Sequence, residues 1–121
     1  MHTERPALIY DGECGFCRDA VALVARWDRD HRVALIPFQD RAQVAAFALP
    51  LPALAAAMHL VLPDGRVFAG ADAAAELLRL LPGKRWLADT FALPGVLPVA
   101  RRVYAWIAER RHCLVRGVAP Q

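Results

Sequence analysis

The sequence is short of cysteine and of long apolar segments, and each shortage excludes a class of protein. Its 121 residues contain three cysteines, an odd and low number that argues against a framework of structural disulfides. The longest run without a charged residue, 42–63, is rich in alanine and is interrupted by Pro50, Pro52 and His59. Such a run argues against a membrane-spanning helix, so we expect no membrane span.

The start of the chain also lacks the pattern of a targeting segment. Residues 1–6 include histidine, glutamate and arginine and no long apolar stretch, which argues against a secretory signal peptide. Two closely spaced cysteines outside a secretory context are typical of redox chemistry first and of metal binding second. We therefore expect a cytoplasmic protein.

Charge is unevenly distributed along the chain. The formal net charge is +3, whereas the segment from Lys84 onward holds seven lysines or arginines against Asp89 and Glu109, a net of +5. A basic end can meet an acidic partner, a lipid surface or nucleic acid, but it is also the ordinary pattern of a solvated helix face. We favour the solvated face and expect no nucleic-acid partner. The oligomeric state stays open.

Length and composition are those of one compact domain. A chain of 121 residues, 57% hydrophobic and 22% charged, can bury a core of its own and is not a disordered tail. No internal repeat is present, because the two Phe-Ala-Leu-Pro segments at 47–50 and 91–94 are too short to count. We predict one domain over 1–121, with a core over 1–83 and a helical extension over 84–121 packed on it.

Apolar runs and helical periodicities alternate along the chain. Short runs with β-branched or aromatic residues predict strands at 7–10, 33–38, 58–62 and 66–69. Amphipathic spacing or a capping residue, with Asp40 and Asp72 as expected caps, predicts helices at 15–28, 41–48 and 72–81. Prolines predict a loop or broken helix over 49–57, and two further helices over 84–118 broken at Pro94-Gly95 and Pro98.

The order of these segments predicts the fold class. A helix between the first two strands requires a parallel pair with a right-handed crossover. Asp64-Gly65 supplies the backbone angles of a tight turn, so the last two strands form an antiparallel hairpin. The simplest assembly is an α/β fold with a mixed four-stranded sheet flanked by helices.

The candidate site is the pair Cys14 and Cys17, which lies between the first strand and the first helix. The unpaired N–H groups and the positive end of the helix dipole favour a thiolate at Cys14. Cys17 follows one turn later on the same face, so its sulfur can resolve a mixed disulfide formed by Cys14. We predict that Cys14 is the nucleophile and that Cys17 is the resolving thiol. A pair of small buried residues without reactivity is the alternative.

Asp11, Phe16 and Arg18 flank the pair. A carboxylate at Asp11 opposes a thiolate at Cys14 by charge repulsion, but it can relay a proton to or from Cys17. Asp11-Gly12 can instead be the turn that leads into the helix, with no chemical role. Phe16 offers an apolar contact beside the thiols, and Arg18 is expected to be a solvated surface residue.

Metal binding is the main chemical alternative. A structural zinc site needs four ligands, usually as two close pairs. Cys113 is the third cysteine, but it adjoins His112, and neighbouring helical residues point about 100° apart. We therefore expect no metal site, a helical thiol without a role at Cys113, and a partly buried strand residue at His59.

The residues Tyr10-Asp11-Gly12-Glu13-Cys14-Gly15-Phe16-Cys17 resemble the signature of the DCC family, small thioredoxin-like proteins named for an aspartate and two cysteines. The resemblance extends over nearly the whole chain, through Met58-His59-Leu60, Asp64-Gly65, Gly70, Ala73-Ala74, Leu81-Pro82, Trp86, Tyr104 and Arg110-Arg111.

This resemblance implies a thioredoxin-like fold and a thiol–disulfide oxidoreductase activity with Asp11, Cys14 and Cys17 as functional residues. It implies no bound cofactor besides a redox-active Cys14–Cys17 disulfide, and a protein or low-molecular-weight thiol or disulfide as substrate. Ordinary thioredoxins place a cis-proline before the third strand, where this chain has Ala57-Met58. A non-enzymatic binding module and a metal-binding protein are the alternative functions.

Overall fold

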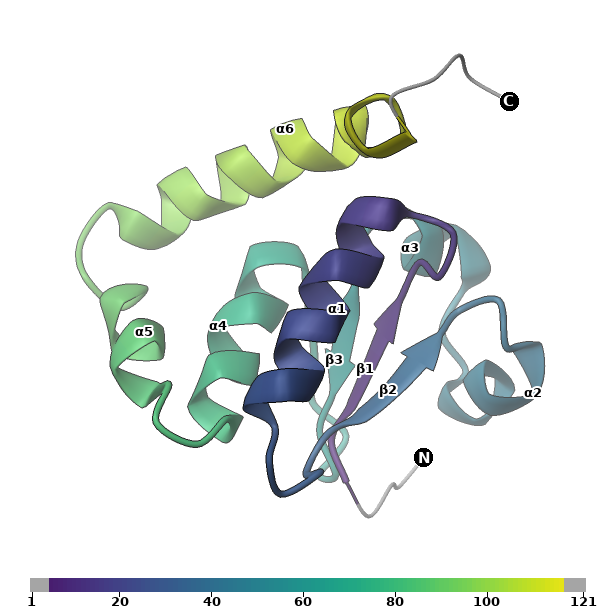
Figure 1. The fold of residues 1–121 in the computed structure, drawn as a ribbon, viewed down its shortest axis with the longest axis horizontal. Helices are drawn as coiled ribbons and strands as arrows, with labels where there is room; N and C mark the ends of the chain where they lie inside the picture. Colours follow the sequence, from purple (N-terminus) through teal and green to yellow (C-terminus); the bar gives the residue numbers. More distant parts are fainter. Residues whose placement is uncertain (1–4, 117–121) are drawn as a thin grey trace.

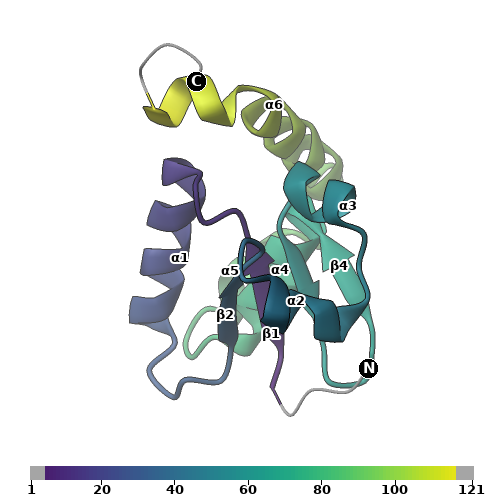
Figure 2. The ribbon, with the colours of Figure 1, turned by 90° about the vertical axis from the view of Figure 1, so that its right-hand side faces the viewer.

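The computed structural model describes residues 5–116, with side chains for residues 5–107 and for Glu109. Its centre is a four-stranded sheet in the order β2-β1-β3-β4, formed by Ala34–Pro37, Ala7–Tyr10, His59–Val61 and Val67–Ala69 (Figure 1; β4 is labelled in Figure 2). β1 pairs with β2 in parallel, and β1–β3 and β3–β4 are antiparallel. The sheet is mixed, and the fold is α/β and thioredoxin-like, as predicted.

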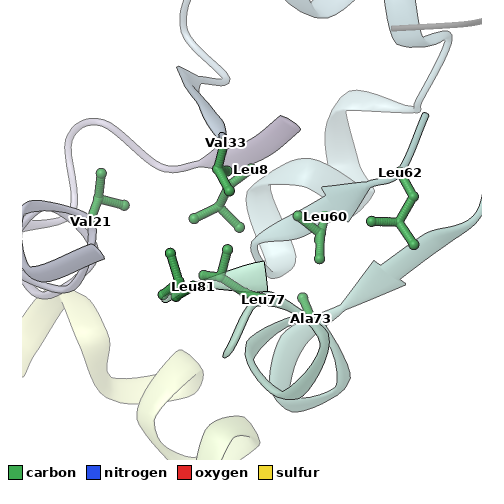
Figure 3. Packing of buried hydrophobic residues seen from close by; sticks show 8 residues of the cluster. All are labelled: Leu8, Val21, Val33, Leu60, Leu62, Ala73, Leu77 and Leu81. Atoms are coloured by element: carbon green, nitrogen blue, oxygen red, sulfur yellow. The ribbon is translucent and has the colours of Figure 1, made fainter. Parts of the chain in front are cut away.

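The two faces of the sheet carry separate apolar clusters. Leu8 and Leu60 face α1 (Gly15–Trp27) and α4 (Gly70–Leu80), where they form a cluster with residues such as Val21 and Leu77 (Figure 3). Ile9 and Val61, the next residues along β1 and β3, point to the opposite face of the sheet, because side chains alternate along a strand. They pack against α2 (Arg41–Val44) and α3 (Leu51–Ala56).

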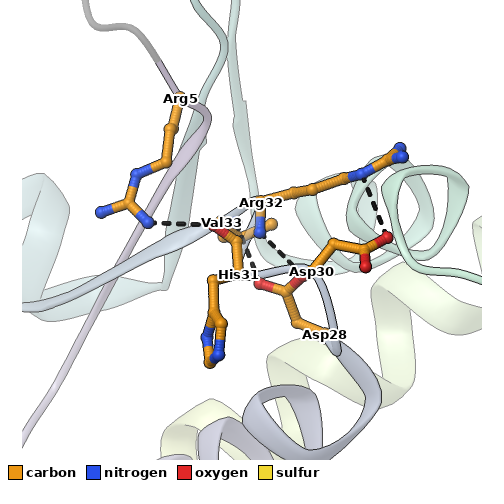
Figure 4. Close-up of polar contacts among 6 residues, drawn as sticks. All are labelled: Arg5, Asp28, Asp30, His31, Arg32 and Val33. Atoms are coloured by element: carbon orange, nitrogen blue, oxygen red, sulfur yellow. Dashed lines mark hydrogen bonds and ion pairs between the residues drawn. The ribbon is translucent and has the colours of Figure 1, made fainter.

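The connection between α1 and β2 is closed by a buried aspartate. Asp28 is only 3% exposed and ends α1. Its carboxylate accepts the backbone N–H groups of Arg32 and Val33, each at 2.9 Å (Figure 4). These bonds satisfy the two backbone amides just before β2 and hold the connection that makes β1 and β2 parallel.

Several predicted elements are confirmed with shifted ends. β1 and the hairpin lie where predicted, and Gly65 in the turn has a φ of 95°. The helix predicted over 41–48 is α2 followed by a 3₁₀ turn over Ala45–Phe47. The segment predicted as a loop or broken helix contains α3, because Pro52 sits in the first turn, where no intrahelical N–H is required.

Two predictions about where helices begin and break are wrong. Asp72 does not cap the fourth helix, because α4 begins two residues earlier at Gly70; its carboxylate instead pairs with Arg101 at 2.9 Å. Pro98 does not break the last helix either. α6 runs over Val96–Arg116, so Pro98 lies in its first turn, where proline is tolerated. The break at Pro94-Gly95, between α5 (Arg85–Thr90) and α6, is confirmed.

The helix α6 lies across the end of the molecule at which α1 begins (Figures 1 and 2). It packs on α4 and α1. The Tyr104 hydroxyl accepts the Met58 N–H at 3.0 Å, and Arg101 forms the ion pair with Asp72. Among the described residues, no helix is both long and apolar enough to cross a membrane.

Candidate functional site

The candidate site is built on the loop between β1 and α1. Asp11 follows β1 directly and is 7% exposed. Its carboxylate Oδ1 accepts the Glu13 N–H at 2.9 Å, and its backbone carbonyl accepts the Cys14 N–H at 3.2 Å. Both bonds are local, so Asp11-Gly12 forms the turn predicted from the sequence. The turn places the next cysteine at the start of α1.

Cys14 is the N-cap of α1 rather than a residue inside its first turn. Its backbone is extended, with φ −87° and ψ 116°, and its Sγ accepts the backbone N–H of Cys17 at 3.3 Å. Sulfur here takes the place of the oxygen of a serine or aspartate cap. The Cys14 sulfur thus lies at the helix N-terminus, next to the backbone of Cys17, and both cysteines are thiols.

The two cysteines differ in exposure. Cys14 is 1% exposed, whereas Cys17 is partly exposed. Phe16 between them is 42% exposed, and Arg18 is exposed, as predicted. A substrate that approaches this end of the molecule therefore meets Phe16 and Cys17 before Cys14.

One site residue, Gln39, was missed by the sequence analysis. Its side-chain amide lies between Asp11 and Gly12: Nε2 donates to Asp11 Oδ1 at 2.8 Å, and Oε1 accepts the Gly12 N–H at 2.9 Å. A signal was available. Because β1 and β2 are parallel and Tyr10 pairs with Pro37, the residues just after them leave the sheet at the same edge.

Gly12 fits closely under Gln39. A Cβ at this position would lie 3.0 Å from the Cβ of Pro37 and 3.1 Å from Gln39 Oε1. A larger residue would thus push against the amide that holds the loop. The residues Asp11 and Gly12 therefore form the turn and also fit against Gln39 on the neighbouring loop.

The segment that precedes β3 is engaged within the chain. Ala57 and Met58, the residues that the family resemblance compares with the thioredoxin proline, lie between α3 and β3. The Ala57 carbonyl lies 2.9 Å from Nδ1 of His59, which is 8% exposed. Met58 donates its N–H to Tyr104 and accepts the Gly70 N–H at 3.0 Å. His59 lies in strand β3, as predicted, but it is buried rather than partly buried.

The metal alternative finds no ligand cluster near the pair. Among the described side chains, no three histidine, cysteine, aspartate or glutamate residues form a group able to hold a metal ion. Cys113 and His112 lie outside the described side chains, as do Arg110 and Arg111. Cys14 and Cys17 supply two possible ligands, half of what a structural zinc site needs.

Comparison with known proteins covers nearly the whole chain. The model of a family described as DCC1-like thiol-disulfide oxidoreductase matches residues 8–116. A curated relative, the uncharacterized protein YuxK of Bacillus subtilis (strain 168), is 30% identical over 107 residues, which are 87% of this chain and 77% of the relative. No solved structure matches.

Proposed function

Because this chain belongs to the DCC1-like thiol-disulfide oxidoreductase family, we propose that it exchanges a Cys14–Cys17 dithiol and disulfide with a protein or low-molecular-weight thiol or disulfide. The observation that carries the proposal is the position of the Cys14 sulfur. It caps α1 and accepts the Cys17 N–H, so the two residues lie together at the end of the helix where backbone N–H groups point outward.

The reductive direction has two steps. The Cys14 thiolate attacks a substrate disulfide, forms a mixed disulfide with one substrate sulfur and releases the other as a thiolate. Cys17 then loses its proton and attacks Cys14 Sγ, which forms the Cys14–Cys17 disulfide and releases the second substrate thiolate. Two electrons pass to the substrate, and an external thiol regenerates the dithiol. The oxidative direction is the reverse, and neither requires a bound cofactor.

Asp11 is the third residue of the proposed site. Its carboxylate is buried in the loop that leads to Cys14. We assign it the transfer of a proton to or from Cys17 as that thiol becomes the resolving nucleophile. A carboxylate suits this task because it accepts the proton without competing as a nucleophile for the substrate disulfide.

The roles of the two cysteines can be distinguished by trapping. The capping position favours Cys14 as the attacking thiol, although its 1% exposure means that it must become more accessible to meet a protein disulfide. Cys17→Ser should then accumulate mixed disulfides through Cys14, while Cys14→Ser should not. If only Cys14→Ser traps partners, Cys17 is the attacking residue. If neither does, the exchange proposal is wrong.

The first test is a redox titration of the pair. Protein equilibrated in glutathione or dithiothreitol buffers is alkylated and its intact mass is measured. A reversible two-electron step at Cys14 and Cys17, with Cys113 alkylated throughout, is the expected result. A pair that stays reduced over the accessible range would rule out the proposed chemistry. Elemental analysis of protein purified without chelator tests the metal alternative in the same preparation.

A further inference from the structure

Gln39 is connected to the candidate site through both ends of its side-chain amide. One bond goes to a carboxylate oxygen of Asp11 at 2.8 Å and the other comes from the backbone of Gly12 at 2.9 Å. The network fixes the orientation of the amide, since only the NH₂ group can donate to the carboxylate and only the oxygen can accept the Gly12 N–H. An apolar or shorter side chain cannot make both bonds.

The fold explains why this residue reaches the site from 28 positions away. The parallel pairing of β1 and β2 brings the loop after Pro37 beside the loop after Tyr10. Gln39 Nε2 joins the Glu13 N–H on the same Asp11 oxygen, so donors from two loops converge there. The direction of the Asp11 carboxylate is therefore set by tertiary structure as well as by the local turn.

We propose that Gln39 is a positioning residue for thiol–disulfide exchange, which holds the Asp11 carboxylate and the Gly12 peptide in the orientation that Cys14 and Cys17 require. The inference rests on the proposed function. Both of these hydrogen bonds of Gln39 go to Asp11 and Gly12, so it acts through the Asp11 carboxylate and through the loop that ends at Cys14. Loss of its side-chain amide should slow the proton-linked step, which is the attack of Cys17 on the mixed disulfide. The variants should remain folded.

The chain offers a matched control. Gln43 also donates through Nε2 to a neighbouring aspartate, Asp40, at 2.6 Å, but this pair is exposed at the start of α2. Gln43→Leu therefore removes a glutamine–aspartate bond of the same chemistry, one that joins α2 to its own cap residue. Gln39→Leu removes both bonds of the proposed positioning residue. Gln39→Glu keeps an acceptor for Gly12 but replaces the donor to Asp11 with a second carboxylate, which repels that of Asp11.

The experiment measures resolution of a mixed disulfide in a single turnover. Each variant, in a Cys113→Ser background, is treated with 5,5′-dithiobis(2-nitrobenzoate), and release of the second thionitrobenzoate anion by the neighbouring cysteine is followed by absorbance over a range of pH. Gln39→Leu and Gln39→Glu both lose the hydrogen bond to the charged Asp11 carboxylate, so each should slow this release on the order of tenfold. Gln43→Leu should leave it unchanged.

Each outcome bears on a separate claim. If the parent protein forms no adduct, or forms one that the second cysteine does not resolve, the proposed function fails. If the parent resolves its adduct and both Gln39 variants do so at the parent rate with the same pH profile, the positioning role is wrong. Thermal unfolding of all variants identifies a folding defect. If Gln39→Leu does not fold, the rate at which Gln39→Glu releases the second thionitrobenzoate decides whether Gln39 has the positioning role.

Discussion

Alanine at position 12 would place a methyl group between the loops that follow β1 and β2. The added Cβ would lie 3.0 Å from the Pro37 Cβ and 3.1 Å from Gln39 Oε1, closer than the ~3.5–4.0 Å of an ordinary carbon contact. The crowding should cost about 1–3 kcal/mol. Alanine also makes the unfolded chain less flexible than glycine does, which stabilises the folded protein by about 0.4–1 kcal/mol. We expect a net loss of roughly 1 kcal/mol and a Tm lower by about 3–6 °C.

Gly12→Ala should also disturb the thiols, because it displaces the amide that orients Asp11. The measurement is thermal unfolding combined with the rate of alkylation of Cys14 and Cys17. Gly65→Ala is the control: Gly65 has a φ of 95° and no atom within 4 Å of the added Cβ, so its cost is backbone strain far from the site. A Gly12→Ala protein with raised stability and unchanged alkylation would refute the reasoning.

Three further changes test contacts elsewhere in the fold. Asp28→Ala leaves the buried Val33 N–H and the Arg32 N–H without their acceptor and should cost about 1–3 kcal/mol in denaturant unfolding; an unchanged midpoint would contradict the role of Asp28 in the crossover. Tyr104→Phe removes the acceptor of the Met58 N–H and should cost about 1 kcal/mol, with faster hydrogen exchange at Met58 but not at Leu60; equal exchange in both proteins would count against it. Hydrogen bonds from the Gln43 side chain and backbone lower the pKa of Asp40, so its contribution to stability is present above the usual carboxylate pKa and is lost as pH falls through the lowered value. The NMR titration of Asp40 should move to higher pH in Gln43→Ala, and an unmoved titration would exclude this cause.

The elements that could be predicted are those with strong local signals. The apolar run at 7–10, the amphipathic spacing after Cys14 and the Asp64-Gly65 turn each predict their element within a residue or two. The Asp72 and Pro98 signals misled because each residue type has two uses. An aspartate near a helix start is a cap or an ion-pair partner, and a proline ends a helix or sits in its first turn.

The candidate site likewise has features that local sequence predicts and features that it does not. Asp11, Cys14 and Cys17 lie within seven consecutive residues, so a turn followed by a helix is enough to bring them together. The catalytic roles assigned to them stay predictions. The burial of Cys14 was not predicted. A short pattern around Cys14 does not report how closely distant segments pack over its side chain.

The sequence by itself determined the chemistry that this protein can offer, because a Cys-x-x-Cys pair after a strand and at a helix start is specified by neighbouring residues and by backbone hydrogen bonding. Only the tertiary structure decided what surrounds that pair. Gln39 meets Asp11 and Gly12 because parallel pairing brings the ends of β1 and β2 to one edge of the sheet. Such contacts depend on register and packing between distant segments, and these arise from burial of the whole core rather than from any short stretch of chain.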